Sequence, residues 1–308
     1  MNGTAPNMTR GIFLMLSAIT VFTFMSAFIK AAGRVPAGEA MFFRSVMAMP
    51  IILAWLVTHG GIAKGIATQS VRNHAVRGIV GSCAMGLGFA GLKFLPLPEV
   101  TAIRFVTPIV MVVLAALILG ERFRLVRIAA VVLGFVGVVI IVAPRLSVGL
   151  GTSEALGVGL TLGSACLAAL AQVFVKGMAN SESTTAIVFW FSMTATLLSL
   201  TTIPFGWVWP TGYELALLVG AGLVGGLGQI LLTSSYRFAE AGVLAPFTYV
   251  SMLWSVVIGF VWFNEVPTLG MLVGACFVIA SGVIIVLREQ ALGMDATARR
   301  KVKAKGLQ

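Results

Sequence analysis

The amino-acid sequence predicts an all-α polytopic membrane protein with ten transmembrane helices, arranged as two inverted five-helix repeats. The composition indicates a membrane environment, because 59% of the 308 residues are hydrophobic, 10% are charged and the mean hydropathy is +1.04. An internal repeat indicates the arrangement, because Phe28 and Lys30 recur as Phe174 and Lys176, 146 residues later. Each half holds five apolar runs of about 20 residues, the length that crosses a bilayer. Five is odd, so the second half must enter the membrane from the opposite side, as in many secondary carriers.

The expected spans are the apolar runs between prolines and charged residues. Pro96 and Pro98 separate the third span from the fourth, Glu121 and Arg122 end the fourth, and Pro144 ends the fifth. In the second half, an aromatic group suited to the membrane interface separates the seventh span from the eighth. In chain order we expect spans at about 11–31, 38–57, 75–94, 98–119, 125–143, 155–176, 184–204, 213–235, 241–263 and 267–287.

These spans divide the chain into five parts. They are a cytoplasmic N-terminus (1–10), a first repeat (11–143), an inter-repeat loop (144–154), a second, inverted repeat (155–287) and a basic cytoplasmic tail (288–308). Of the 21 Lys and Arg residues, 15 fall on the side that carries both termini, which the positive-inside rule assigns to the cytoplasm. We therefore expect a multi-pass protein of the bacterial inner membrane. The formal charge of +11 does not indicate nucleic-acid binding, because the basic residues lie in short loops and the tail.

Two arginines are expected inside the membrane, where charged side chains are costly and usually functional. Arg44 and Arg104 each lie about six residues into a span that enters from outside, so they should lie at similar depth. Together they would favour a carboxylate, a phosphate or an electron-rich carbonyl on the cargo. The alternative is local pairing, because Glu39 and Glu99 each precede one arginine by five residues.

The acidic residues all lie at span ends, in loops or in the tail. A proton relay through a buried carboxylate is therefore disfavoured, with Glu99 and Glu240 as the exceptions closest to the spans. Glu121 and Glu265 occupy equivalent places in the repeat and are expected to cap helix ends. The residues expected to act as a gate or in ion pairs are Glu39, Glu99, Lys93, Arg237 and Glu240.

Uncharged polar and aromatic residues deeper in the spans complete the expected cargo site. Amides and hydroxyls would hydrogen-bond a neutral cargo, and aromatic faces would stack on a flat ring. The alternative for each is a packing or lipid-facing role. The expected substrate-binding residues are Arg44, Arg104, Thr107, Gln172, Gln229, Thr248, Tyr249 and Trp254.

No pattern in the sequence indicates an enzyme. The histidines are His59 and His74, both expected as loop residues, and the spans hold no aspartate for an intramembrane catalytic pair. The three cysteines lie within apolar runs without paired spacing, so we expect no metal site and no disulfide. We expect no cofactor. The expected partners are a small-molecule cargo and membrane lipid, with assembly into a homo-oligomer left open.

Four segments resemble the drug/metabolite transporter superfamily of the EamA type. They are FFRS at 42–45, AGLKFLP at 90–96, EVTAIRFVTP at 99–108 and LGER at 119–122. The resemblance covers 11–287 and implies ten helices in two inverted repeats around a central cavity, with alternating access. Members of this family carry amino acids, riboflavin, S-adenosylmethionine, nucleobases and drugs, in either direction.

The pattern is similar to the branch of importers for riboflavin or S-adenosylmethionine. Within that branch the charges favour riboflavin uptake, because the sulfonium cation of S-adenosylmethionine would be repelled by Arg44 and Arg104. An amino acid is the alternative, since its carboxylate matches an arginine, and S-adenosylmethionine and drugs, taken up or exported, remain further cargoes.

Overall fold

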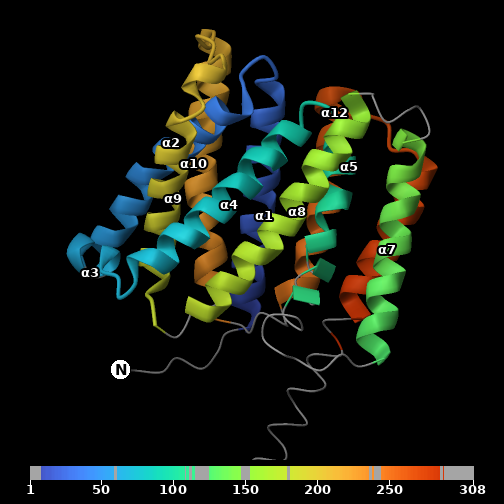
Figure 1. Ribbon diagram of the computed structural model, residues 1–308, viewed down its shortest axis with the longest axis horizontal. Helices are drawn as coiled ribbons and strands as arrows, with labels where there is room; N and C mark the ends of the chain where they lie inside the picture. The colour runs from blue at the N-terminus through green and yellow to red at the C-terminus, as the bar shows by residue number, and fades with distance from the viewer. Residues whose placement is uncertain are drawn as a thin grey trace, which may run out of the picture.

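The protein is described by a computed structural model at residues 8–58, 61–107, 109–110, 113–114, 125–146, 153–178, 181–235, 238, 244–284 and 287. Within these ranges the chain forms helices and turns and no β-strand (Figure 1). Several sequence expectations lie outside the described residues: most of the N-terminus and the inter-repeat loop, the second half of the fourth span, the basic tail, and His59, Glu121, Arg237 and Glu240.

The described part of the first half of the chain contains four long helices and two short ones. The helices are α1 (Met8–Ala31), α2 (Ala37–Thr58), α3 (Ile62–Ile66), α4 (Val71–Gly91), α5 (Leu97–Arg104) and α7 (Leu125–Leu146). The third span begins earlier than expected, at Val71, because the Ser70 side chain caps the helix by accepting a hydrogen bond from the backbone N–H of Asn73.

The described residues of the second half also form a series of helices. Its elements are α8 (Ser153–Met178), α9 (Thr184–Leu200), the 3₁₀ turn η1 (Ile203–Phe205), α10 (Gly212–Ser235), the 3₁₀ turn η2 (Ala245–Tyr249), α12 (Val250–Phe263) and a further helix at 269–284. The ninth span is therefore not one regular helix. Its first part is the 3₁₀ turn η2, which contains Pro246.

The helices of one half pack mainly against helices of the other half. α1 packs on α10, α4 on α8, and α2 lies against both α9 and α10 (Figure 1). α5 packs on α12 and α8, again across the halves. At one edge of the bundle the backbones of α7 and helix 269–284 approach each other closely at Gly137 and Gly274. A side chain at either position would collide with the other helix, so the absence of a side chain at both positions allows this approach. The two halves therefore share one core and are not separate side-by-side domains.

Polar contacts define two ends of the bundle. At the first, which we call the Lys30 end, the C-terminus of α1 meets the C-terminus of α4, and Arg34 meets the start of α10. At the opposite end, the His74 end, the segment after α8 meets the start of α4, and Arg10 at the start of α1 stacks on Phe238, which follows α10. Because α1 finishes at the Lys30 end and α8 at the His74 end, these two helices run in opposite directions.

The described helices suit a bilayer. Four of them, α1, α2, α8 and α10, contain stretches long and apolar enough to cross a membrane, and the apolar helices at 132–144, 185–200, 247–263 and 269–284 are shorter. Large apolar side chains project outward, including Phe205 at 85% exposure and Leu269 at 78%. Exposed apolar surface of this extent is typical of a lipid-facing protein, so the chain is a multi-pass membrane protein.

Candidate functional site

Two arginines lie against the same phenylalanine ring inside the bundle. The guanidinium carbon of Arg77, on α4, is 4.0 Å from the centre of the Phe191 ring on α9. The guanidinium carbon of Arg44, on α2, is 5.7 Å from the centre of the same ring. The two guanidinium groups are therefore no further apart than the sum of these distances, so two positive charges from different helices converge on one place. We call this group the arginine pair.

The arginine pair has no counter-charge among the described residues. The Nε and Nη1 atoms of both arginines are buried without a hydrogen-bond partner, and the Arg44 side chain is only 5% exposed. Burying an unpaired charge costs several kcal/mol even after the protein relaxes. The Phe191 ring offsets part of this cost, because a cation over an aromatic face contributes about 0.5–2 kcal/mol.

Local pairing of Arg44 with Glu39 does not occur. Glu39 instead accepts a hydrogen bond from the backbone N–H of Val208, at 3.0 Å. The reason is helical geometry: five residues correspond to about 500° of rotation, so the two side chains leave α2 on different faces. Glu99 is buried at 5% exposure near the start of α5. Lys93 is exposed.

Arg104 combines a deep position with an accessible side chain. Its neighbours Ala102 and Ile103 are at most 1% exposed, and α5 is enclosed by α7, α8 and α12. The Arg104 side chain nevertheless is exposed. The charge of Arg104 is therefore accessible, although its neighbours on α5 are buried.

The aromatic candidates lie on the ninth span and differ in role. Tyr249 packs edge-on against Phe105, with ring centroids 5.0 Å apart, and its hydroxyl fills the space that a side chain at position 282 would need. Trp254, one helical turn beyond, is 36% exposed. Thr248 is half-buried, and its backbone carbonyl accepts a hydrogen bond from the Ser251 hydroxyl.

The remaining polar candidates lie on three different helical segments. Thr107, just beyond α5, is half-buried, Gln229 on α10 is half-buried, and Gln172 on α8 is exposed. Among the described residues, no hydrogen bond or ion pair joins these three side chains to the arginine pair.

Ion pairs between the halves close the Lys30 end. Lys30 Nζ lies 2.8 Å from Glu265 Oε1 and donates hydrogen bonds to the carbonyls of Leu92 and Leu95. Glu265 Oε2 accepts a hydrogen bond from the Leu97 N–H, so this carboxylate caps the N-terminus of α5. Nearby, Arg34 forms a two-point ion pair with Glu214. Both interactions connect the two halves of the chain.

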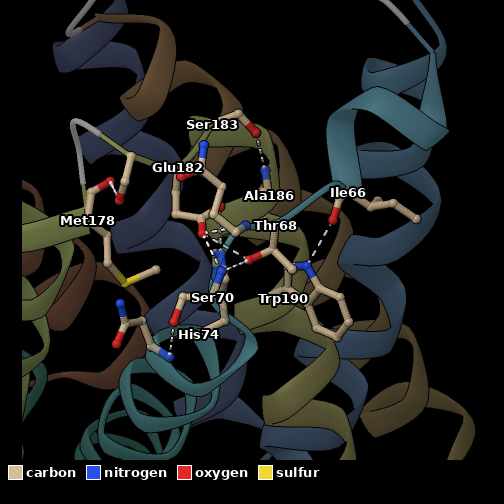
Figure 2. Close-up of polar contacts among 12 residues, drawn as sticks. Ile66, Thr68, Ser70, His74, Met178, Glu182, Ser183, Ala186 and Trp190 are labelled. Carbon is tan, nitrogen blue, oxygen red and sulfur yellow. Dashed lines mark hydrogen bonds and ion pairs between the residues drawn. The ribbon is translucent and has the colours of Figure 1, made fainter.

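A buried carboxylate organises the His74 end (Figure 2). Glu182 Oε2 lies 3.2 Å from His74 Nε2, and Glu182 Oε1 accepts hydrogen bonds from Thr68 Oγ1 and from the N–H groups of Gln69 and Ser70. Burial alone would raise the pKa of Glu182, but the contact with His74 and these hydrogen bonds together hold it below its usual value. The expectation that His74 is a loop residue is wrong, because it lies on α4 and is 1% exposed.

Trp190 belongs to the same end. Its indole Nε1 donates a hydrogen bond to the Ile66 carbonyl, which ties α9 to α3 (Figure 2). Among the described residues no three His, Cys, Asp or Glu side chains are grouped as metal ligands.

Arg77 is the functional candidate that sequence reasoning missed. A third span that starts at residue 75 leaves Arg77 near its cytoplasmic edge. The sequence therefore groups Arg77 with the basic residues of the cytoplasmic loops. The same rule that selected Arg44 would have selected Arg77 once the span starts at Val71, since it then lies six residues inside the helix.

Comparisons with known proteins find similar transporters and a similar fold. A pseudopaline exporter of Pseudomonas aeruginosa is 29% identical over 92% of this chain and 95% of its own length. An S-adenosylmethionine uptake transporter of Rickettsia prowazekii is 25% identical over 94% of this chain and 97% of its own. A solved crystal structure matches with a TM-score of 0.66 at 19% identity, covering 92% of this chain and 99% of that chain, and so shows the fold.

The family match extends over both halves. The model of the EamA-like transporter family matches residues 9–143 and again 155–287. The family and these relatives are named as transporters, which indicates transport rather than enzymatic catalysis. This protein therefore belongs to the EamA-like transporter family.

Proposed function

We propose that this protein is a secondary carrier that moves a small organic metabolite across the bacterial inner membrane by alternating access. The observation that carries the proposal is the full-length similarity to transporters of small metabolites, over more than nine-tenths of each chain. The exposed Arg104 on an enclosed helix supports it, because a carrier needs open, polar space between its helices.

We further propose that the two halves, 11–143 and 155–287, are inverted repeats of five spans each, joined by 144–154. The opposite directions of α1 and α8 support the inversion, since they are the first helices of the two halves. The interlocked packing of the halves supports a cargo site at their interface. Both termini would be cytoplasmic, with the His74 end facing the cytoplasm, because most Lys and Arg residues lie on that side.

For the cargo we propose a metabolite related to S-adenosylmethionine or an amino acid. Riboflavin, the expectation from the charges alone, has no support from the relatives, whose names concern S-adenosylmethionine and pseudopaline. Arginines would repel the sulfonium cation of S-adenosylmethionine, but this repulsion concerns only that one group of the molecule. The same molecule also carries a carboxylate, which an unpaired arginine attracts.

The proposed cargo site comprises the arginine pair and the polar side chains on the facing spans. The residues proposed to contact cargo are Arg44, Arg77, Arg104, Thr107, Gln172, Gln229, Thr248, Tyr249 and Trp254. The proposed gate at the Lys30 end is the interface that Lys30 and Glu265 close, together with Glu39, Glu99 and Lys93.

The test is counterflow in liposomes reconstituted with purified protein. Vesicles are preloaded with unlabelled S-adenosylmethionine, methionine or riboflavin, and accumulation of the same labelled compound is measured against protein-free vesicles. We expect saturable counterflow for S-adenosylmethionine or methionine and none for riboflavin. Counterflow of riboflavin alone overturns the cargo proposal, and flux that does not saturate overturns the carrier mechanism.

The site is tested in the same assay with Arg104→Ala. We expect this variant to insert normally and to lose counterflow, because the accessible charge is removed. Arg72→Ala is the matched control, since Arg72 is exposed at the start of α4. Normal counterflow by Arg104→Ala would limit Arg104 to a structural role.

A further inference from the structure

We infer that Arg44, Arg77 and Phe191 form a subsite that binds the carboxylate of the cargo, between α2, α4 and α9. This inference rests on the proposed carrier function and adds the substrate class, a small organic acid or zwitterion. It also assigns a role to Arg77, which neither its position in the sequence nor the similarity to known carriers indicates.

The arginine pair is electrostatically incomplete. Four nitrogen atoms, Nε and Nη1 of each arginine, are buried without a hydrogen-bond partner. The positive charge of Arg44 also acts on Arg77, and like charges at this distance repel each other. Buried polar groups in folded proteins are almost always satisfied, so we infer that water or a ligand from outside the chain supplies the partner for these donors.

Four of the described carboxylates near the two ends are engaged elsewhere. Glu39 accepts from Val208, and Glu182 is held by His74 and three further donors. Glu214 pairs with Arg34, and Glu265 pairs with Lys30. None of these four is available to the arginine pair without breaking a contact that it already makes, so a small anion is the partner that fits.

The packing around the pair holds both arginines in place. Gly81 lies one turn after Arg77 on α4, and a Cβ there would come within 3.0 Å of the Phe191 ring. Gly225 on α10 leaves room for Arg44, since a Cβ there would lie 3.4 Å from Arg44 Nε and 2.8 Å from the Met25 sulfur. The two glycines thus let the ring and the guanidinium groups approach one another. Arg77 as a residue is half-buried, whereas its Nε and Nη1 atoms are buried.

The position of the pair suits a carrier. Arg44 is seven residues from the start of α2 at the Lys30 end, and Arg77 is six residues from the start of α4 at the His74 end. At a rise of 1.5 Å per residue, each backbone lies about 10 Å inside its own end of the bundle. The two long side chains reach toward each other from opposite ends, so an anion between them lies within the membrane span, where carriers hold cargo.

A carboxylate matches the donor geometry. The guanidinium fork offers paired, parallel N–H groups, and arginine-carboxylate bonds are commonly bidentate. The ring of Phe191 lies against both guanidinium groups. A phosphate group shares this chemistry, and the experiments below separate the two.

The first experiment needs no knowledge of the cargo. Arg77→Glu places a carboxylate within the chain beside Arg44, where it takes the position of the bound anion. We expect the thermal midpoint of the purified protein in detergent to rise by about 2 °C or more, because an unpaired charge gains a partner. Arg72→Glu, with the same charge change at an exposed position, is the control and should leave the midpoint unchanged. A midpoint of Arg77→Glu lower than that of the control overturns the inference, since it shows that Arg77 serves packing alone.

The second experiment uses probes that differ only in the carboxylate. The thermal midpoint is measured with methionine against methioninamide, with S-adenosylmethionine against its decarboxylated form, and with inorganic phosphate. We expect the carboxylate member of a pair to raise the midpoint of the wild type, and Arg77→Gln to weaken that apparent affinity about 10-fold or more. Equal shifts within both pairs, or a shift with phosphate alone, overturn the carboxylate assignment.

The outcomes separate this inference from the carrier proposal. Counterflow of the wild type can be normal and yet unchanged by Arg77→Gln and by removal of the carboxylate from the transported compound. In that case the carrier function stands and the subsite is wrong. If carboxylates stabilise the wild type through Arg77 while counterflow is absent for every compound tested, the subsite stands and the transport proposal is wrong.

Discussion

Phe105 and Tyr249 pack against each other with their ring centroids 5.0 Å apart and their planes at 66°. They occupy equivalent positions in the two halves, because FVT at 105–107 matches YVS at 249–251, 144 residues later. Regular α-helix is interrupted at both positions: α5 ends at Arg104, and the 3₁₀ turn η2 ends at Tyr249. Contact between equivalent residues is expected for a pair close to the axis that would relate the proposed inverted repeats, and Arg104 directly precedes Phe105 in the chain.

The tight fit of Tyr249 against Gly282 gives the first prediction. A Cβ at position 282 would collide with the Tyr249 hydroxyl. Gly282→Ala should therefore destabilise the protein by about 1–3 kcal/mol through overpacking, measured as a lower thermal midpoint in detergent. Tyr249→Phe removes the hydroxyl and should restore part of the loss in the double variant, since the ring carbon that carried the hydroxyl still lies 2.6 Å from the added Cβ. If the double variant is no more stable than Gly282→Ala alone, the hydroxyl is not the cause.

The ion pair between Lys30 and Glu265 gives the second prediction. Both side chains are largely buried, at 14% and 16% exposure, so neither charge can simply return to water. Lys30→Met should cost about 3 kcal/mol or more, because it leaves Glu265 with an uncompensated charge. The charge-swapped double variant Lys30→Glu with Glu265→Lys should be more stable than either single swap, as measured by thermal midpoints and counterflow. Equal stability of the double variant and the worse single variant would show that the pair contributes nothing.

The proposed orientation gives the third prediction. Gly33, after α1, and Ser181, after α8, are exposed at opposite ends of the bundle. In a background in which Cys83, Cys166 and Cys276 are replaced by alanine, Gly33→Cys should react with a membrane-impermeant maleimide on intact cells. Ser181→Cys should react only after the membrane is permeabilised. Equal reactivity of both positions on intact cells would contradict the inversion of the two halves.

The buried carboxylate at the His74 end gives the fourth prediction. The pKa of Glu182 is lowered in the folded protein relative to its usual value of 4.5. A lowered pKa means that the unfolded state binds the proton more tightly, so this group stabilises the fold above pH 4.5. That contribution is lost as the pH falls below 4.5 and through the folded pKa. Glu182→Gln should therefore lower the thermal midpoint at pH 6 and have progressively less effect toward pH 3.

The control for this pH dependence is Glu154→Gln. Glu154 lies in the first turn of α8 and is half-buried, so it tests whether any partly buried glutamate behaves in the same way. A difference between the wild type and Glu182→Gln that stays constant from pH 6 to pH 3 would show that Glu182 is not ionised in the folded protein.

The sequence by itself determined the class of this protein and its repeat. Apolar runs of membrane-spanning length follow directly from composition, and the recurrence of Phe28 and Lys30 as Phe174 and Lys176 needs no structure. Arg44 and Arg104 were also found from the sequence, because a charge within an apolar run is conspicuous wherever the helix packs.

Only the tertiary structure decided which polar groups meet. Arg77 joins Arg44 because α2 and α4 both pack against α9, and Glu39 turns away from Arg44 to bind Val208, 169 residues later in the chain. His74 is buried because a carboxylate from the other half of the chain reaches it. Spacing along one helix fixes only the face on which a side chain lies, whereas its partner is set by helices far away in sequence, and no local pattern records that choice.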